Sequence, residues 1–335
     1  MTNYLANFKH KHGIFLILFI FVWIFSVITI SEFSIVNGTT TTMTNEVFIM
    51  YAGSLVKIFE EMVGPAFEKE TSYTFVGEGK GSVQVSNLIR DGFRTPDVFV
   101  SAGTIPIIRL MNTTPTPLAN WLLEFGSAEI VIAYSQNSPH YSDLEKARKG
   151  EIPWYKVVSQ EGFKFGRTDP ELDPKGYYGI ITTELANIYY NDSSIKDRML
   201  GEDRNPKQIF PEETLKTVLE TGQLDAIIAY EHEAISRGLP YITLPDKINL
   251  SNPKFNDFYK QGNYTLKSDQ RVIYGEPVFF SITIPNTVKN LDGAVSFVNF
   301  ILSKNGSQLL ENQGLNRINA TYEGDVNKIP LAIIP

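Results

Sequence analysis

The 335-residue sequence contains no cysteine and four histidines. Without cysteine the chain can form neither disulfides nor thiolate metal sites, and it offers no N-terminal cysteine for lipid modification. His10 and His12 precede the first apolar run, and His140 and His232 lie far apart, so a zinc site is not expected. A Ser-His-Asp arrangement, a P-loop and a metal-hydrolase motif are also absent, which argues against an enzyme.

An excess of positive charge is missing as well. The sequence has 30 Lys and Arg against 37 Asp and Glu, a net charge of -7, and no Lys/Arg cluster that could follow a phosphate backbone. A nucleic-acid partner is therefore not expected. With 43% hydrophobic and 20% charged residues, the composition is globular, and the length suits two domains.

The N-terminus carries one long apolar run, "IFLILFIFVWIFSVITI", which spans residues 14 to 30 without a charge. Lys9 and Lys11 precede it and Glu32 follows it, which predicts a cytoplasmic N-terminus and an outward-facing chain downstream. No A-x-A pattern follows the run, which favours an uncleaved anchor. Pilin-type processing after Gly13 is the alternative.

A Thr-rich stretch, "NGTTTTMTN", follows the run and is typical of a short stalk. We therefore expect residues 1–45 to form a membrane anchor and stalk, with the folded part outside the cell membrane. The number of N-x-S/T sequons fits a glycosylated surface protein. They lie at Asn37, Asn112, Asn191, Asn249, Asn263, Asn305 and Asn319.

Downstream of the stalk, apolar strands alternate with amphipathic helices. Three segments each contain an apolar strand that is followed by small residues: "EVFIMYAGSL", "SYTFVGEGKGSVQVSNLIRDG" and "PDVFVSAGT". Alternating strands and helices predict an α/β fold with mostly parallel sheets, and the later segments suggest two α/β lobes. Ligands collect at the carboxyl ends of such strands, where Ser54, Ser82 and Ser101 are expected.

Gly53-Ser54 and Gly81-Ser82 each join a strand to a helix. Such a turn exposes unpaired helix N-terminal amides beside a hydroxyl, so the pair could hold one anion. The alternative is that both serines merely cap helices.

The segment "RTDPELDPKGYYG", residues 167 to 179, brings Asp169, Glu171 and Asp173 together. Its two prolines predict a rigid loop that ends in a glycine turn, with a helix following over "IITTELANIYY". A carboxylate beside an oxyanion costs about 4 kcal/mol per charge pair at an effective dielectric of about 20. An oxyanion centred on a large metal ion escapes this conflict, because the metal accepts carboxylate oxygens as further ligands.

Seven segments resemble the archaeal-type tungstate/molybdate-binding proteins, which are solute receptors of ABC importers. They are "YAGSL", "GKGSVQ", "PDVFVSAG", "EIVIAYS", "FGRTDPELDPKGYYG", "ETGQLDAIIAYEHEAI" and "PVFFSITIP", in that order. The resemblance covers roughly residues 46 to 320, and its most specific element is D-P-x-x-D-P-x-G-Y. It implies a two-lobed, type II periplasmic-binding-protein-like fold with two crossover strands. We expect 46–127 and 277–335 to form lobe 1 and 128–276 to form lobe 2.

The resemblance also implies a six-coordinate ligand metal, with four oxo groups and one Asp and one Glu from the protein. The Asp matches Asp173. The Glu matches Glu212 when the helix before "TGQLDAIIAY" keeps its length, and Glu213 when the P-x-E signature is aligned. The residues that match the oxo-binding positions are Ser54, Ser82 and Tyr230.

Two positions depart from the pattern of this family. Gly103 stands where we expect many relatives to carry Asp, and Tyr178 stands where Arg often follows the Gly-Tyr pair. The expected ligand is tungstate or molybdate, with no further cofactor. The expected partner is an ABC permease, and the expected state is a monomer.

Three other interpretations remain open at the level of sequence. The same fold could bind sulfate or phosphate. Tyr177, Tyr178 and Tyr230 could surround ferric iron, because phenolates are hard ligands. The chain could also be a glycosylated surface adhesion protein without a small ligand.

Overall fold

The structure is a computed structural model that describes residues 45 to 333. The apolar run expected to anchor the chain lies outside these residues. Within the described part, no helix combines the length and apolar character needed to cross a membrane.

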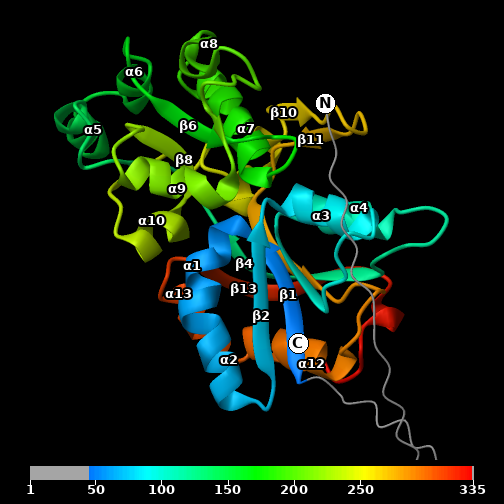
Figure 1. The fold of residues 1–335 in the computed structure, drawn as a ribbon. Helices are drawn as coiled ribbons and strands as arrows, with labels where there is room; N and C mark the ends of the chain where they lie inside the picture. The colour runs from blue at the N-terminus through cyan, green and yellow to red at the C-terminus, as the bar shows by residue number, and fades with distance from the viewer. Residues whose placement is uncertain (1–44, 334–335) are drawn as a thin grey trace, which may run out of the picture. The chain divides into compact units, whose positions relative to one another are not determined.

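Lobe 1 is built on a six-stranded sheet with the order β13-β4-β12-β3-β1-β2 (Figure 1). β1 is parallel to both β2 and β3, whereas β12 runs antiparallel to β3 and β4 and β13 runs antiparallel to β4. The strands are β1 Glu46–Ala52, β2 Thr74–Lys80, β3 Val98–Ala102, β4 Trp121–Ala128, β12 Val278–Thr283 and β13 Asn316–Gly324.

Helices cover both faces of this sheet because its buried strands alternate apolar side chains between two cores. On one face, Met50 and Phe99 pack in a cluster with residues of α3 and α4. On the other face, the aromatic ring of Phe297 contacts the rings of Phe59 and Phe67. The helices of lobe 1 are η1 Gly53–Leu55, α1 Val56–Ile58, the π-helical turn η2 Phe59–Val63, α2 Gly64–Glu70, α3 Ser82–Arg90, α4 Ile105–Met111, α12 Leu291–Leu302, α13 Lys304–Glu311 and η4 Val326–Lys328.

Lobe 2 is built on a five-stranded sheet with the order β7-β6-β8-β5-β9 and a separate β10-β11 hairpin. The strands are β5 Ile130–Tyr134, β6 Phe165–Thr168, β7 Ile209–Phe210, β8 Ala226–Tyr230, β9 Tyr241–Thr243, β10 Asn263–Thr265 and β11 Val272–Tyr274. The helices are α5 Tyr141–Arg148, α6 Trp154–Val158, α7 Pro174–Tyr189, α8 Ile195–Leu200, α9 Glu212–Glu220, α10 Glu231–Arg237, η3 Pro253–Phe255 and α11 Asn256–Tyr259.

The chain passes between the lobes twice, between β4 and β5 and again between β11 and β12. The two passages lie close together, since the amides of Ile130 and Val278 donate to the carbonyls of Asn249 and Leu250, each at 2.8 Å. Asn249 belongs to a sequon, but it is fully buried and its amide donates to Glu129 Oε2 at 3.0 Å. This sequon is therefore closed to glycosylation in the folded chain.

Three expectations from the sequence are wrong. The two lobe sheets are not mostly parallel, because five of their nine strand pairings are antiparallel. The segment expected as one strand, 127 to 135, is divided between β4 and β5 in different sheets. The segment 174 to 179, expected as loop, is the first part of α7, with Pro174 at its start. Proline suits the first helical position because the amide it lacks would have no partner there.

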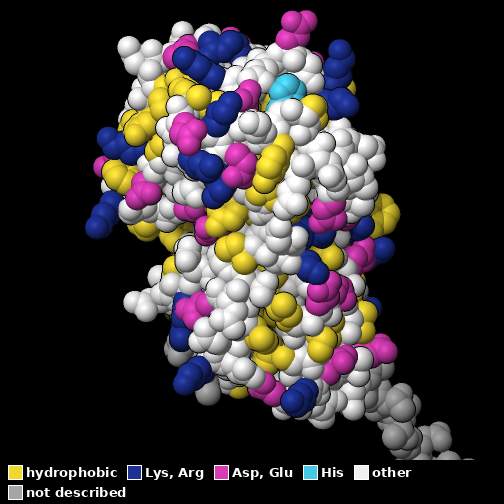
Figure 2. All heavy atoms as spheres, turned by 90° about the vertical axis from the view of Figure 1, so that its left-hand side faces the viewer, with side chains coloured by type: hydrophobic (Ala, Val, Ile, Leu, Met, Phe, Trp, Pro, Cys, Tyr) yellow, Lys and Arg dark blue, Asp and Glu magenta, His cyan; other side chains and the backbone are white. Residues whose placement is uncertain are grey.

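Positive and negative side chains are interspersed over the face drawn in Figure 2. This face carries no extended patch of one sign, in keeping with the net charge of -7.

Candidate functional site

The two Gly-Ser turns of lobe 1 lie at the carboxyl ends of adjacent strands. Gly53-Ser54 follows β1 and begins η1, and Gly81-Ser82 follows β2 and begins α3. Neither serine caps its helix, because the N-cap residues are Ala52 and Gly81 and no side chain bonds to the turn amides. The capping interpretation of the serines is therefore wrong.

The two serine hydroxyls differ in their partners. Ser82 is fully buried, and its Oγ accepts a hydrogen bond from the amide of Ala102 at 3.1 Å, which joins the ends of β2 and β3. Ser54 is 7% exposed, and its Oγ has no hydrogen-bond partner among the described residues. A buried hydroxyl without a partner is costly, so Ser54 is suited to bind a ligand atom.

In lobe 2, Asp173 also lies at the start of a helix, where it is the N-cap residue of α7. Its Oδ1 accepts hydrogen bonds from the amide of Lys175 at 2.9 Å and from Thr168 Oγ1 at 2.8 Å. Among the described residues nothing donates to Oδ2. Burial raises the pKa of Asp173, and the nearby Lys175 ammonium opposes that shift. One carboxylate oxygen is thus fixed and the other is available.

The other two acids of this segment have structural partners. Asp169 forms an ion pair with Arg204, with Oδ2 2.5 Å from Nη2. Glu171 accepts from the hydroxyl of Tyr264 at 2.7 Å and from the amide of Lys267 at 3.0 Å, which ties the β10-β11 hairpin to the loop. Of the three acids in 167 to 179, only Asp173 therefore belongs to the candidate site, whereas Asp169 and Glu171 bind other segments of lobe 2 and hold the loop in place.

Glu212 and Glu213 have different environments at the start of α9. Glu212 is 4% exposed and packs against Gly53 of lobe 1. The side chain of Glu213 is 34% exposed and lies 3.6 Å from Lys80 Nζ. Of the two aligned candidates, the structure buries Glu212 against a Gly-Ser turn and leaves Glu213 at the rim.

The lobes are in direct contact at these residues. A Cβ atom at Gly81 would lie 2.5 Å from the carbonyl oxygen of Leu172 and 3.1 Å from Asp173 Cβ. The amide of Gln84 donates to the same Leu172 oxygen at 2.9 Å. The structure therefore brings Gly53-Ser54 against Glu212 and Gly81-Ser82 against Asp173.

A hollow of about 260 Å³ opens at this junction. Asp173 and Glu212 both line it, together with Glu213 and with Gly81 and Gln84 from lobe 1. Ser54, Ser82 and Tyr230 do not line it. The described residues contain no group of three or more His, Cys, Asp or Glu side chains placed to hold a metal ion.

Tyr230 ends β8 and is 1% exposed. Its ring stacks on His232 with centroids 5.5 Å apart, and its hydroxyl has no hydrogen-bond partner within the described part of the chain. Burial raises the pKa of the hydroxyls of Tyr177, Tyr178 and Tyr230 well above the usual range.

A buried ion cluster, formed by Lys175, Lys216, Glu212 and Glu233, lies beside these residues. Lys175 Nζ is 3.0 Å from Glu212 Oε1 and 2.8 Å from Glu233 Oε2, and Lys216 Nζ is 2.8 Å from Glu212 Oε1. Burial raises the pKa of Glu212 to about 7 against the attraction of both lysines. Burial acts in the same direction on Glu233, but the two ammonium groups outweigh it and hold the Glu233 pKa well below its usual value.

Sequence reasoning did not identify the members of this cluster other than Glu212. The available signal was a lysine inside the acidic segment, in "DPKGYY". A single lysine in a polar stretch is ordinarily solvated, so its burial follows from contacts that join distant parts of the chain.

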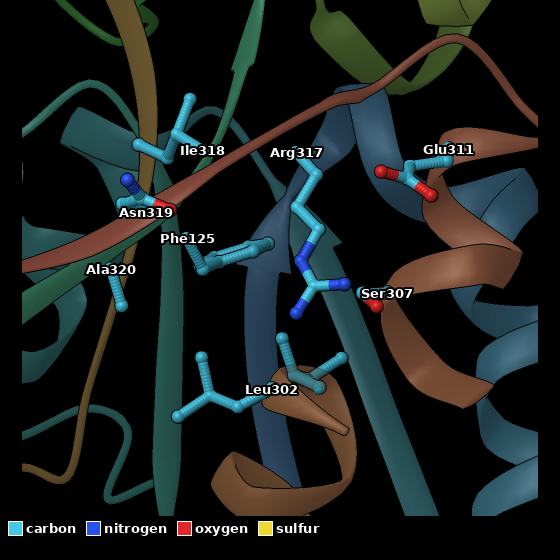
Figure 3. A pocket seen from close by; sticks show the side chains of 9 residues that line it. Phe125, Leu302, Ser307, Glu311, Arg317, Ile318, Asn319 and Ala320 are labelled. Carbon is cyan, nitrogen blue, oxygen red and sulfur yellow. The ribbon is translucent and has the colours of Figure 1, made fainter. Parts of the chain in front are cut away.

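A larger hollow, of about 450 Å³, lies within lobe 1 (Figure 3). It adjoins an irregularity in the pairing of β13 with β4, between Arg317 and Thr321. Its charged side chains, Arg317 and Glu311, are exposed. It has no contribution from lobe 2 and contains none of the residues expected in the site.

Comparison with known proteins agrees with this two-lobed arrangement. An uncharacterized solute-binding protein of Petrotoga mobilis is 31% identical over 93% of this chain and 93% of its own length. The molybdate/tungstate-binding protein WtpA of Pyrococcus abyssi is 31% identical over 79% of this chain and 83% of its own length. The periplasmic molybdate-binding protein of Azotobacter vinelandii shares the fold, with a TM-score of 0.57 at 15% identity over 80% of this chain and 98% of that one. Residues 47–316 match the family model described as bacterial extracellular solute-binding protein, and the chain therefore belongs to that family.

Proposed function

We propose that this protein is the extracellular receptor of an ABC importer and that it binds tungstate or molybdate between its two lobes. The observation that carries the proposal is the contact of two Gly-Ser turns of lobe 1 with two carboxylates of lobe 2, Asp173 and Glu212. The relatives named molybdate/tungstate-binding support this ligand class.

The proposed division of labour follows from the available atoms. Ser54, Ser82 and Tyr230, with the amides at the Gly-Ser turns, hold the oxo groups, since anions bind readily at helix N-termini. Asp173, through its free Oδ2, and Glu212 complete the six-coordinate metal, because hard, high-valent metals favour carboxylate oxygen. Sulfur in sulfate does not accept such ligands, so the same carboxylates repel sulfate by about 4 kcal/mol per charge pair.

The transport role follows from the family and from the N-terminal sequence. In this proposal the apolar run at 14–30 holds the chain on the outer face of the cell membrane, and the loaded receptor, as a monomer, docks on a permease. The lobes close around the ligand by a hinge motion, which is typical of two-lobed binding proteins. The protein binds its ligand without transforming it.

Calorimetric titration of the detergent-solubilised full-length chain tests the proposal. Tungstate, molybdate, sulfate, phosphate and ferric citrate are titrated into the wild type, the variant Asp173→Ala and the rim control Glu213→Gln. The proposal expects tight binding of tungstate and molybdate alone, with a loss of at least 100-fold in Asp173→Ala and a change of at most about threefold in Glu213→Gln. Equal binding of sulfate, or unchanged binding by Asp173→Ala, contradicts it.

A further inference from the structure

The β10-β11 hairpin is separate from the sheets of both lobes (Figure 1), and its turn spans residues 266 to 271. The turn is a defined structure rather than a loose connection. The amide of Leu266 donates to the carbonyl of Arg271 at 2.8 Å, and the amide of Arg271 donates to Asp269 Oδ1 at 3.2 Å. The position of Asp269 is therefore fixed relative to the two strands.

Glu171 fastens this turn to the acidic segment that contains Asp173. Its Oε1 accepts hydrogen bonds from the Tyr264 hydroxyl at 2.7 Å and from the amide of Lys267 at 3.0 Å, and its Oε2 accepts from the amide of Ser268 at 3.3 Å. Hydrogen bonds to an ionised carboxylate are stronger than those between neutral groups. Glu171 lies two residues before Asp173, so the turn is expected to move together with this segment of lobe 2.

Asp269 connects the same turn to lobe 1. Its Oδ1 is engaged within the turn, and its Oδ2 lies 3.3 Å from Nε of Arg109 in α4. The Arg109 side chain is 8% exposed, and its Nη1 has no hydrogen-bond partner among the described residues. A guanidinium with so little exposure is costly to bury without a counter-charge. The ion pair with Asp269 therefore stabilises the arrangement in which lobe 1 lies against the hairpin.

We infer that the β10-β11 hairpin is a strap that stabilises the closed arrangement of the two lobes. Glu171 fixes the strap to lobe 2, and the ion pair of Asp269 with Arg109 binds it to lobe 1. Both connections are needed, because a turn that is released from either lobe no longer holds the two together. These contacts are made within the chain, so the strap does not depend on which ligand the protein binds.

A double-mutant cycle between Glu171 and Arg109 tests the strap. No hydrogen bond or ion pair joins these two residues in the described part of the chain, and substitutions at residues without contact usually have additive effects. The variants are Arg109→Ala, Glu171→Ala and the double variant. The matched control is Glu184→Ala, because Glu184 Oε2 accepts from the amide of Asn263 at 2.9 Å at the end of the hairpin away from the turn. Circular dichroism and thermal unfolding check that each variant is folded.

The separation of the lobes is measured in the full-length protein without ligand. Because the chain has no cysteine, Lys69→Cys in lobe 1 and Lys149→Cys in lobe 2, at two exposed positions, give one spin label in each lobe. Double electron–electron resonance then gives the ratio of open to closed molecules. Arg109→Ala and Glu171→Ala are each expected to raise this ratio about two- to fivefold, as suits one partly exposed ion pair, and the double variant no further. In the Glu184→Ala background, Arg109→Ala should raise the ratio by its full factor.

Three outcomes would overturn the inference. The first is an unchanged ratio in Arg109→Ala or in Glu171→Ala. The second is a double variant in which the two increases multiply, because each residue would then act alone. The third is the same lack of additivity with Glu184→Ala, which would assign the effect to a general loosening of the hairpin. The proposed function is judged separately, since it fails if the wild type does not bind tungstate, whatever the ratio of open to closed molecules.

Discussion

The substitution Gly81→Ala tests whether the contact between the lobes is part of ligand binding. Gly81 has φ -53° and ψ 131°, a conformation that alanine adopts without strain, so the backbone of the turn is not the obstacle. The obstacle is the other lobe, since the new Cβ would lie 2.5 Å from the carbonyl oxygen of Leu172. That oxygen belongs to the backbone and cannot swing away as a side chain would.

The size of the effect follows from this geometry. Relief to an ordinary 3.4 Å contact requires the lobes to separate at this point by about 0.9 Å. The same movement lengthens the hydrogen bond from the Gln84 amide to Leu172, now 2.9 Å, beyond useful range. Loss of that bond and of close packing around the ligand should cost about 1.4 to 2.8 kcal/mol, a 10- to 100-fold loss of affinity.

Calorimetry and thermal unfolding of the ligand-free chain are measured side by side, with Gly306→Ala as control. A Cβ at Gly306 would collide with the carbonyl of Phe300 inside lobe 1. Gly81→Ala is expected to lower affinity with little change in unfolding temperature, and Gly306→Ala to lower the unfolding temperature with little change in affinity. If Gly81→Ala binds the wild-type ligand with unchanged affinity, the lobes do not need this contact and the reasoning is refuted.

Three further predictions concern stability and closure. Burial raises the pKa of Glu276 from 4.5 to about 7, so its contribution to stability is full below pH 4.5 and is lost as the pH rises through 7. Glu276→Gln should remove up to about 3 kcal/mol of that pH dependence. Denaturant titrations at pH 5 and 8 give the change in the free energy of unfolding between the two pH values, and an equal change in the variant and the wild type would contradict the prediction. Phe297→Ala, at the centre of the lobe 1 aromatic core, should destabilise by about 3 to 5 kcal/mol, and urea unfolding showing a loss below about 1 kcal/mol would be inconsistent with that packing. Arg109 Nε lies 3.3 Å from Asp269 Oδ2 across the lobes, so Arg109→Ala should weaken ligand binding about two- to fivefold at low salt and less at 0.5 M salt; a loss independent of salt would assign the effect to packing.

Much of the fold was predictable because its signals are local. Strands that end in Gly-Ser and continue into amphipathic helices indicate an α/β protein, and the structure has Ser54 and Ser82 at such turns. The start of α7 was not predictable in the same way. Proline before Lys175 is compatible with a rigid loop and equally with the first residue of a helix, so the local pattern does not decide between them.

The buried ion cluster was beyond the reach of the sequence. Lys175 and Glu233 are 58 positions apart, and Lys175 and Glu212 are 37 apart. The segments "DPKGYY" and "EHEA" are polar enough to be solvated, so the burial of these charges arises from tertiary packing of α7, α9 and α10. The unused hydroxyl of Ser54 is equally a property of the fold, since a serine at a helix start ordinarily caps it.

The two departures from the sequence pattern turn out to be neighbours. Gly103 has φ +79°, and a Cβ there would lie 3.0 Å from the hydroxyl oxygen of Tyr178. That hydroxyl donates to Glu276 at 3.2 Å. The tyrosine therefore fills space that a larger residue at position 103 would need, which neither position indicates when it is considered separately.

The bond between the Leu172 carbonyl and the Gln84 amide has a kinetic consequence. Leu172 accepts the hydrogen bond from lobe 1, and it immediately precedes Asp173, which is proposed to bind the metal. The two residues therefore belong to one turn and are expected to move together. If the ligand binds between the lobes as proposed, this turn has to withdraw before the ligand can leave. Changes at Leu172 should therefore alter the residence time of the ligand far more than its rate of capture. Under the proposed function, a permease that separates this turn from α3 would thereby trigger release of the ligand.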